Sequence, residues 1–131
     1  MMGVYTMDDK ITQKKSDFLK ALAHPTRLNI LQSLREGERC VCEIIELVDA
    51  EQSNTSQHLS ILKKKNILTS RKEGLKVIYR IKDDKIFLLL NLLEQLIASQ
   101  MEESMDILEN LKKRQMDANS GSRYLNPPHG S

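Results

Sequence analysis

The stretch from residue 52 to residue 68, QSNTSQHLSILKKKNIL, constrains the fold more than any other part of this chain. Leu59 and Leu62 follow Thr55 at helical spacing, so the three residues share one face. Ser53 is a suitable N-cap residue, because its hydroxyl can accept a hydrogen bond from a free backbone N–H. The lysines that follow complement the negative pole of the helix dipole. The pattern predicts a short helix with one packed face and one polar face.

The polar face of this helix offers short side chains that could reach base edges or phosphates in a DNA groove. The side chains at this face or near the helix start are those of Asn54, Ser56, Gln57, His58 and Ser60. An ordinary amphipathic surface helix would also have a polar face. The helix alone therefore leaves DNA binding and a plain surface role open.

Positive charge is concentrated in and after this helix. Residues 51–82 contain eight Lys or Arg and only two acidic residues, although the whole chain has a net charge of only +2. The segments before and after are net negative. Concentrated positive charge favours phosphate binding, because binding releases counterions from the nucleic acid. A solvated charged surface is the less specific interpretation of the same run.

Apolar periodicity predicts a mainly helical fold with one small β-hairpin. Pro25 suits the first position of the second helix, and Gly37 suits a left-handed C-cap at its end. A short third helix, a turn of about four residues and the polar helix form a helix-turn-helix. A basic hairpin with its turn at Glu73-Gly74 follows it as a wing. The expected segments are helices over 9–22, 25–36, 43–48, 53–65 and 84–116, and strands over 67–72 and 76–81.

The domain prediction follows from these segments. Residues 1–8 and 117–131 are expected to be disordered, the second because they are rich in Gly, Ser, Pro and Asn. Residues 9–116 are expected to form one winged helix-turn-helix domain with a long terminal helix. No apolar run approaches the roughly 18 residues that a membrane-spanning helix needs. The N-terminus also lacks the pattern of a secretory signal, so we expect a cytoplasmic protein.

The apolar band of the final helix is wide for a surface helix. A chain this short has no obvious internal surface for a helix on the order of 45 Å long. We therefore expect a homodimer, with a helix packed across its own domain as the alternative.

Three separated motifs resemble the arsenical-resistance repressor (ArsR/SmtB) family of winged-helix transcription factors. They are ALAHPTRLNIL at 21–31, the 52–68 stretch and VIYR at 77–80. The resemblance implies a dimeric repressor with the element order α-α-α-α-β-β-α, terminal helices at the dimer interface, and a double-stranded DNA operator with inverted repeats. The resemblance also implies that the protein is not an enzyme and needs no obligatory cofactor. The DNA-binding residues predicted with this resemblance are Gln52, Ser53, Asn54, Ser56, Gln57, His58, Lys63, Arg71, Lys72 and Lys76.

The two histidines near these motifs have local alternatives. His58 could hydrogen-bond within the helix pair and fix its orientation, or contact a phosphate. His24 precedes Pro25 at a helix start, which favours a structural role over a ligand role.

Cys40-Val41-Cys42 resembles the inducer site of the arsenic- and cadmium-sensing members. Thiolates select soft ions, so arsenite, Cd(II), Pb(II) and Zn(II) are possible inducers. A helix start beside Arg39 should favour the thiolate form. In an ideal helix, residues two apart point about 200° from each other. Chelation by both sulfurs is therefore expected to unwind the first turn of the third helix.

This triplet departs from the family pattern, because the chain has no third cysteine for arsenite. A small-molecule thiol, water or Glu43 could supply a third ligand. The family's second site uses Asp, His and Glu on the final helix, and residues 84–116 contain no His. A thiol redox switch and a plain packing role are the alternatives for the pair. A thiol oxidoreductase is disfavoured, because no βαβ pattern surrounds the cysteines.

Overall fold

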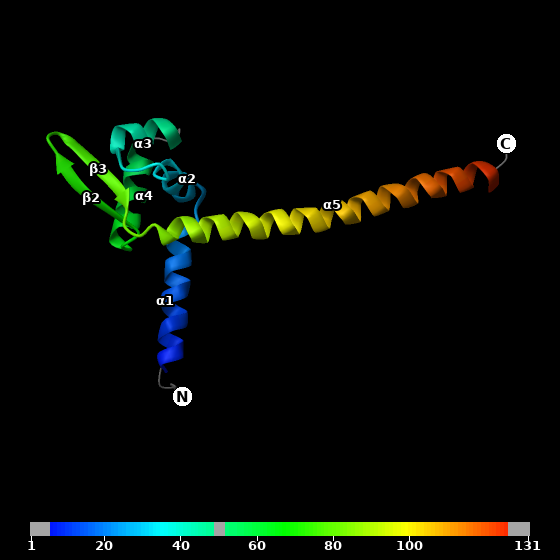
Figure 1. The fold of residues 1–131 in the computed structure, drawn as a ribbon, viewed down its shortest axis with the longest axis horizontal. Coiled ribbons are helices and arrows are strands. Elements are labelled where there is room, and N and C mark those ends of the chain that lie inside the picture. Colours follow the sequence, from blue (N-terminus) through cyan, green and yellow to red (C-terminus); the bar gives the residue numbers. More distant parts are fainter. Residues whose placement is uncertain (1–5, 49–51, 126–131) are drawn as a thin grey trace. The chain divides into compact units, whose positions relative to one another are not determined.

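The computed structural model describes residues 6–48 and 52–125 (Figure 1). The chain divides into two compact units, one ending at Phe87 and the other beginning at Leu88. The observed elements are α1 (Met7–Leu22), α2 (Pro25–Ser33), β1 (Arg39–Cys40), α3 (Val41–Val48), α4 (Gln52–Lys64), β2 (Leu68–Glu73), β3 (Lys76–Ile81) and α5 (Lys85–Leu125). The mainly helical winged helix-turn-helix fold is confirmed. No helix in the described part of the chain is long and apolar enough to cross a membrane.

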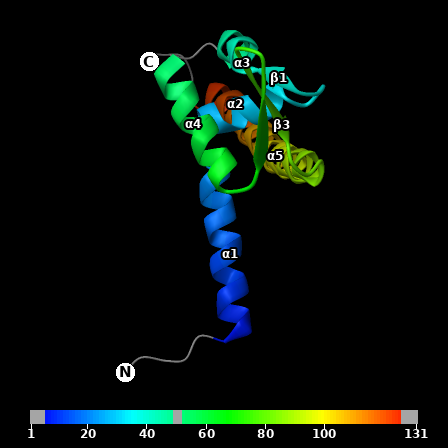
Figure 2. The ribbon, with the colours of Figure 1, turned by 90° about the vertical axis from the view of Figure 1, so that its left-hand side faces the viewer.

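Helix α1 begins at Met7, two residues before the predicted start, because Thr6 and Asp9 form a capping box. The Asp9 N–H donates to Thr6 Oγ1 at 3.1 Å, and the Thr6 N–H donates to Asp9 Oδ2 at 3.0 Å. Only Ala21 and Leu22 of this helix are buried. Most of α1 therefore extends away from the other helices of the first unit (Figure 2).

Helix α2 begins at Pro25, as predicted, but ends at Ser33 rather than at Glu36-Gly37. The Ser33 hydroxyl donates to the Ile30 carbonyl at 2.6 Å, and the Leu34 N–H donates to the Leu31 carbonyl at 3.1 Å. These bonds satisfy carbonyls of the last turn before residue 36. Gly37 is therefore not the C-cap, although its φ of +138° still favours glycine.

Strand β1 was not predicted from the sequence, and it changes where the third helix begins. Cys40 pairs with Ile78 and Arg39 pairs with Tyr79, both antiparallel on β3. The sheet therefore has three strands in the order β1-β3-β2. Helix α3 starts at Val41, so Cys40 lies in the sheet and Cys42 lies in the first helical turn.

Helix α4 starts at Gln52, so Ser53 lies within its first turn and is not the N-cap that the sequence predicted. At the other end, Asn66 has a φ of +62°. Its N–H donates to the Lys63 carbonyl at 3.0 Å, and the Ile67 N–H donates to the Leu62 carbonyl at 2.9 Å. This pair of bonds is a Schellman motif, which ends the helix and directs the chain into β2.

The wing is a two-residue hairpin in which Glu73 faces Lys76 across the turn. Gly74 has a φ of +63°, which glycine adopts without steric cost and which such tight turns require. Six residue pairs join β2 and β3, from Leu68 opposite Ile81 to the turn. The hairpin projects from the helices of the first unit (Figure 1).

The core of the first unit is small and aliphatic. Its most deeply buried side chains come from α2, α3, α4 and β2, so these elements hold one another in place. They are Ile30, Leu31, Ile44, Leu59, Leu62, Leu68 and Thr55.

Helix α5 is capped as predicted, since Asp83 Oδ1 accepts from the Lys85 N–H at 3.0 Å. This bond lowers the pKa of the Asp83 carboxyl. The helix continues beyond residue 116 to Leu125, which differs from the disordered tail predicted for residues 117–131. Residues 1–5 and 126–131, where the remaining disorder was predicted, lie outside the described residues.

Candidate nucleic-acid interface and cysteine site

One face of α4 is buried in the core, and this fixes which of its residues face outward. Thr55, Leu59 and Leu62 are at most 1% exposed, as their spacing predicted. The opposite face is exposed to solvent. Its exposed members among the predicted DNA-binding residues are Asn54, Ser56, Gln57 and Lys63. For Gln52 and Ser53 the structure describes only the backbone, which lies in the first turn of α4.

His58 lies on the same helix but turns toward α2. Its Nδ1 accepts a hydrogen bond from Arg27 Nε at 3.1 Å, and its ring lies 4.2 Å from that of His24, centroid to centroid. Arg27 also donates to the Ala21 carbonyl at 3.1 Å, so it joins the end of α1 to α4. Of the two alternatives for His58, the observed hydrogen bond between Arg27 Nε and His58 Nδ1 agrees with a role in orienting the helices. A phosphate contact by this residue stays a prediction.

Burial lowers the pKa of His58, and its electrostatic interactions with His24 and Arg27 lower it further. A neutral imidazole suits this position, since a protonated Nδ1 could not accept from Arg27. His24 has the local role that the sequence predicted: its Nδ1 accepts from the Thr26 N–H at 3.1 Å and caps α2.

The three predicted wing residues differ in their surroundings. Lys72 and Lys76 are exposed, and no ion pair holds either of them within the described residues. Arg71 donates to both carboxylate oxygens of Glu38, at 2.6 and 2.7 Å, and to Glu73 Oε2 at 2.9 Å. The hydrogen bonds from Arg71 lower the pKa of Glu38, and those to Glu38 and Glu73 raise the pKa of Arg71.

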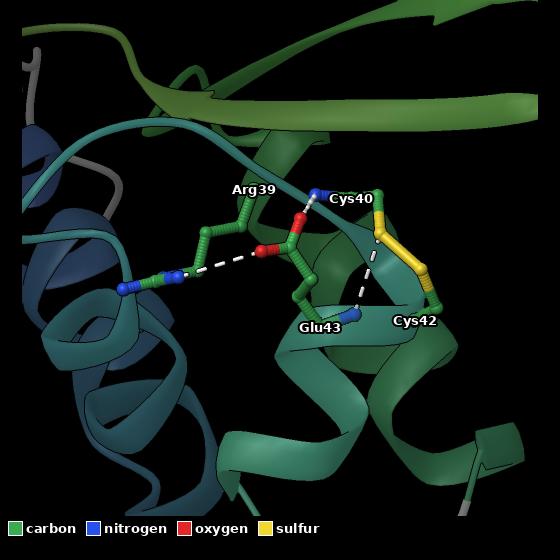
Figure 3. Close-up of a disulfide and its surroundings, with 4 residues drawn as sticks. All are labelled: Arg39, Cys40, Cys42 and Glu43. Atoms are coloured by element: carbon green, nitrogen blue, oxygen red, sulfur yellow. Dashed lines mark hydrogen bonds and ion pairs between the residues drawn. A yellow bond between two sulfur atoms is a disulfide. The ribbon is translucent and has the colours of Figure 1, made fainter.

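The cysteine site is a turn in which a strand passes directly into a helix (Figure 3). The Cys40 N–H donates to Glu43 Oε1 at 3.1 Å, and the Glu43 N–H donates to Cys40 Sγ at 3.4 Å. This reciprocal pair is the arrangement of a capping box, with a cysteine in the position that Ser or Thr usually takes. Cys40 therefore stabilises the start of α3 through its sulfur.

The two sulfurs are joined as a disulfide between Cys40 and Cys42, whose Cα atoms are 5.4 Å apart. The expectation that chelation unwinds the first turn of α3 assumed that the two sulfurs point about 200° apart, and this assumption is wrong. It treated both cysteines as helical, whereas Cys40 is in β1 and its side chain is free of the helical spacing. The sulfurs meet while α3 is intact from Val41 onward.

Arg39 was expected to favour the thiolate form and Glu43 to supply a third ligand, but both side chains form other contacts. Arg39 Nε donates to the Ser33 carbonyl at 2.7 Å, and its Nη1 lies 3.5 Å from Glu43 Oε2. The Glu43 carboxylate lies between Arg39 and the Cys40 N–H, away from the Cys42 sulfur (Figure 3). Neither side chain points at the pair as a third ligand or as a thiolate partner would.

A groove of about 590 Å³ lies beside the sulfurs, between α3 and the end of the hairpin. Its walls are mostly apolar, with one acid and one lysine. They are formed by Cys40, Val41, Cys42, Ile45, Glu46, Leu75, Lys76 and Val77. Cys42 is exposed at this groove, whereas Cys40 is only 3% exposed. In the described part of the chain, the cysteine site included, no group of three or more His, Cys, Asp or Glu could hold a metal ion.

Two features of the site were missed from the sequence. The spacing of Cys40 and Glu43 is that of a capping box, and this signal could have located the helix start. The contact between Glu38 and Arg71 joins residues 33 positions apart and left no local pattern.

Comparison with known proteins gives a consistent result. The model of the bacterial regulatory protein arsR family matches residues 24–70. An HTH-type transcriptional regulator of Methanocaldococcus jannaschii is 42% identical over 85 residues, which are 64% of this chain and 96% of that protein. The cadmium resistance transcriptional regulatory protein CadC of Listeria innocua is 44% identical over 84 residues, or 63% of this chain and 68% of that protein.

A solved structure shows the same fold. It is the homodimeric winged helix-turn-helix DNA-binding domain of a possible ArsR-family regulator from Mycobacterium bovis. The TM-score is 0.67 at 28% identity, and the match covers 79% of this chain and 95% of that one.

Proposed function

Because this chain belongs to the arsR family of bacterial regulatory proteins, which are DNA-binding transcriptional regulators and not enzymes, we propose that it is a repressor controlled by Cys40 and Cys42. Once a small-molecule thiol has reduced the Cys40–Cys42 disulfide, a soft metal or metalloid ion that binds both thiolates releases the repressor from its operator. The observation that carries this proposal is that two sulfurs meet at the junction of the wing sheet and α3. Relatives named for cadmium resistance support a metal inducer.

The proposed DNA surface combines α4 with the wing. The exposed polar side chains of α4 would enter the major groove, where amides and hydroxyls can read base edges. Lys63, Lys72 and Lys76 would contact phosphates, which adds affinity without sequence preference. Buried Leu59 and Leu62 support this role, because they hold α4 at a fixed rotation about its axis.

We also propose that the working form is a homodimer. Apolar side chains along α5 remain exposed, including Leu92 at 57%, Leu96 at 63% and Met101 at 63%. Such a continuous apolar surface usually marks an interface. The homodimeric Mycobacterium bovis domain supports a second copy of this chain as the partner. A two-fold dimer would present two copies of α4 to an inverted repeat.

The route from ion to DNA runs through the start of α3. A sulfur that coordinates an ion is a weaker acceptor for the Glu43 N–H, so the cap of α3 loosens. Cys40 is also paired with Ile78, so a shift of its sulfur pulls on β3 of the wing. Helix α3 packs on α4, and both DNA-contacting elements are therefore adjacent to the ion. By linkage, DNA and ion must weaken each other's binding by the same factor.

The experiment is a parallel titration of the reduced protein bound to a fluorescent duplex selected from a random pool. Cd(II), Zn(II) and arsenite are added separately, and anisotropy reports release. We expect at least one ion to weaken DNA binding by about 5- to 150-fold, the usual range of allosteric coupling. If none of the three changes the affinity at concentrations that saturate the thiols, the proposal fails.

A second candidate is a thiol-redox regulator, which the disulfide between Cys40 and Cys42 favours. Here an oxidant without metal would release the DNA, and dithiothreitol would restore binding. Peroxide added to a metal-free sample separates the two candidates. Release by peroxide together with no response to ions would favour the redox alternative.

A further inference from the structure

The basic wing includes one arginine whose contacts do not suit a DNA ligand. We propose that Arg71 is a positioning residue, which ties the wing to the segment that holds Cys40, and that it does not contact a phosphate. This inference rests on the proposed function, because it assigns Arg71 a part in the coupling between the cysteines and DNA. It replaces the role that the sequence predicted for this residue.

The geometry of the contact supports a fixed link. Both Nη atoms of Arg71 meet the Glu38 carboxylate, at 2.6 and 2.7 Å, which is a bidentate pair. Nη2 also donates to Glu73 Oε2 at 2.9 Å. Bidentate arginine–carboxylate pairs fix orientation as well as distance. Two carboxylates therefore surround one guanidinium, and its positive charge is neutralised before any phosphate approaches.

Glu38 lies in the segment that leads to Cys40, so its pair with Arg71 connects that segment to the wing. Glu38 lies two residues before Cys40, and Arg39 between them pairs with Tyr79 of β3. Arg71 is on β2, opposite Ile78, and Ile78 also pairs with Cys40. The cysteine segment is thus joined to β3 by backbone pairing and to β2 by the Glu38–Arg71 pair. A displacement of Cys40 would move both strands of the wing together.

Lys72 is the matched comparison on the same strand. It follows Arg71 directly, is exposed, and has no ion-pair partner among the residues that the structure describes. It could bind a phosphate without breaking an existing contact. Arg71 could do so only by giving up Glu38, Glu73 or both.

The two roles predict opposite results for Glu38→Gln. If Arg71 contacts a phosphate, removing the competing carboxylate charge should tighten DNA binding. If Arg71 positions the wing, the same change should weaken DNA binding by about two- to fivefold, the range that exposed ion pairs give. Arg71→Lys keeps the charge but loses the fork, so it should weaken binding to a similar extent.

Salt dependence supplies a readout that a structural role does not move. Loss of one phosphate contact lowers the slope of log affinity against log salt by about 0.9. We expect Lys72→Ala to show this loss, and Glu38→Gln and the charge-removing Arg71→Gln to leave the slope unchanged. Glu38→Gln combined with Arg71→Lys should be no weaker than either change alone, since both break one pair. Thermal unfolding of each variant confirms that it folds.

The cadmium response completes the test. In Glu38→Gln, the ratio of DNA affinities without and with Cd(II) should fall about two- to fivefold below that of the unmodified protein. Tighter DNA binding by Glu38→Gln, a reduced salt slope in Arg71→Gln, or an unchanged cadmium ratio would overturn the proposal. If the unmodified protein ignores all three ions, the proposed metal response fails, while the affinity and slope measurements still decide whether Arg71 contacts DNA.

Discussion

Helices α4 and α5 both have an apolar stripe, but the stripe of α5 is buried near its start, at Ile86 and Leu90, and is exposed further along. Leu59 and Leu62 of α4 are at most 1% exposed, whereas Leu96 and Met101 of α5 are each 63% exposed. Helical periodicity predicts that a face will be buried, but it does not say by what. In α4 the buried face fixes the rotation of the helix, so that the polar face is presented to solvent. In α5 the exposed apolar face is suited to an interface with a partner.

The largest expected effect comes from uncovering the buried face of α4. Leu62→Ala should lower the free energy of unfolding by about 2–5 kcal/mol, the range for a fully buried leucine. Chemical denaturation measures it. Leu96→Ala on α5 is the matched control and should leave the stability of the first unit nearly unchanged. Equal losses in both variants would contradict the distinction between the two stripes.

The next effect concerns the exposed face of α5. Leu93→Ala should weaken dimerisation by roughly 1.5–3 kcal/mol, or about 10- to 150-fold, if this face is buried by a second copy. Sedimentation equilibrium over a range of concentrations measures the dissociation constant. Gln95→Ala, on the same helix, should change it little. If the unmodified protein is monomeric over the whole concentration range, the proposed homodimer is wrong.

A smaller effect depends on pH and acts through His58 on α4. Its pKa is lower in the folded chain than the ordinary value of about 6.5, so folding favours the neutral ring. The stability from this site is therefore present above that value and is lost as the pH falls through the folded pKa. Unfolding measured between about pH 8 and pH 5.5 should show this loss. His58→Gln should flatten the profile, and an unchanged profile would contradict the Arg27–His58 contact.

The smallest effect concerns the polar face of α4. Lys63→Ala should lower DNA affinity by a few fold on every sequence and reduce the salt slope by about 0.9, as the loss of one phosphate contact does. Filter binding at several salt concentrations measures both. Lys14→Ala, exposed on α1, is the control for net charge. Equal slopes in the two variants would mean that Lys63 is not at the interface.

Much of the fold could be predicted because its elements have strong periods. The stripe of Thr55, Leu59 and Leu62 predicted α4, and strict alternation predicted β3 from Lys76 to Ile81. Strand β1 was missed because two residues cannot show a period. The missed strand led to the wrong assumption that both cysteines are helical and that their sulfurs point apart.

The site was predictable only in part, for a related reason. Residue type indicated Cys40 and Cys42 as a soft-ion site and the lysines as phosphate ligands. Residue type could not show that Arg71 is held by Glu38, since this contact depends on how the sheet folds. Residue type also could not show that Arg27 donates a hydrogen bond to His58, which lies 31 residues later in the sequence on another helix.

Control of DNA affinity by the Cys40–Cys42 pair can be tested with a variant that lacks both sulfurs. The variant with Cys40→Ser and Cys42→Ser should fold normally, because serine at position 40 can form the same capping box with Glu43. Anisotropy of a labelled operator duplex is recorded for the reduced protein and this variant, with and without Cd(II) or arsenite. We expect equal affinity without ions, and release by an ion from the unmodified protein only. Release from the variant at the same ion concentration would contradict it.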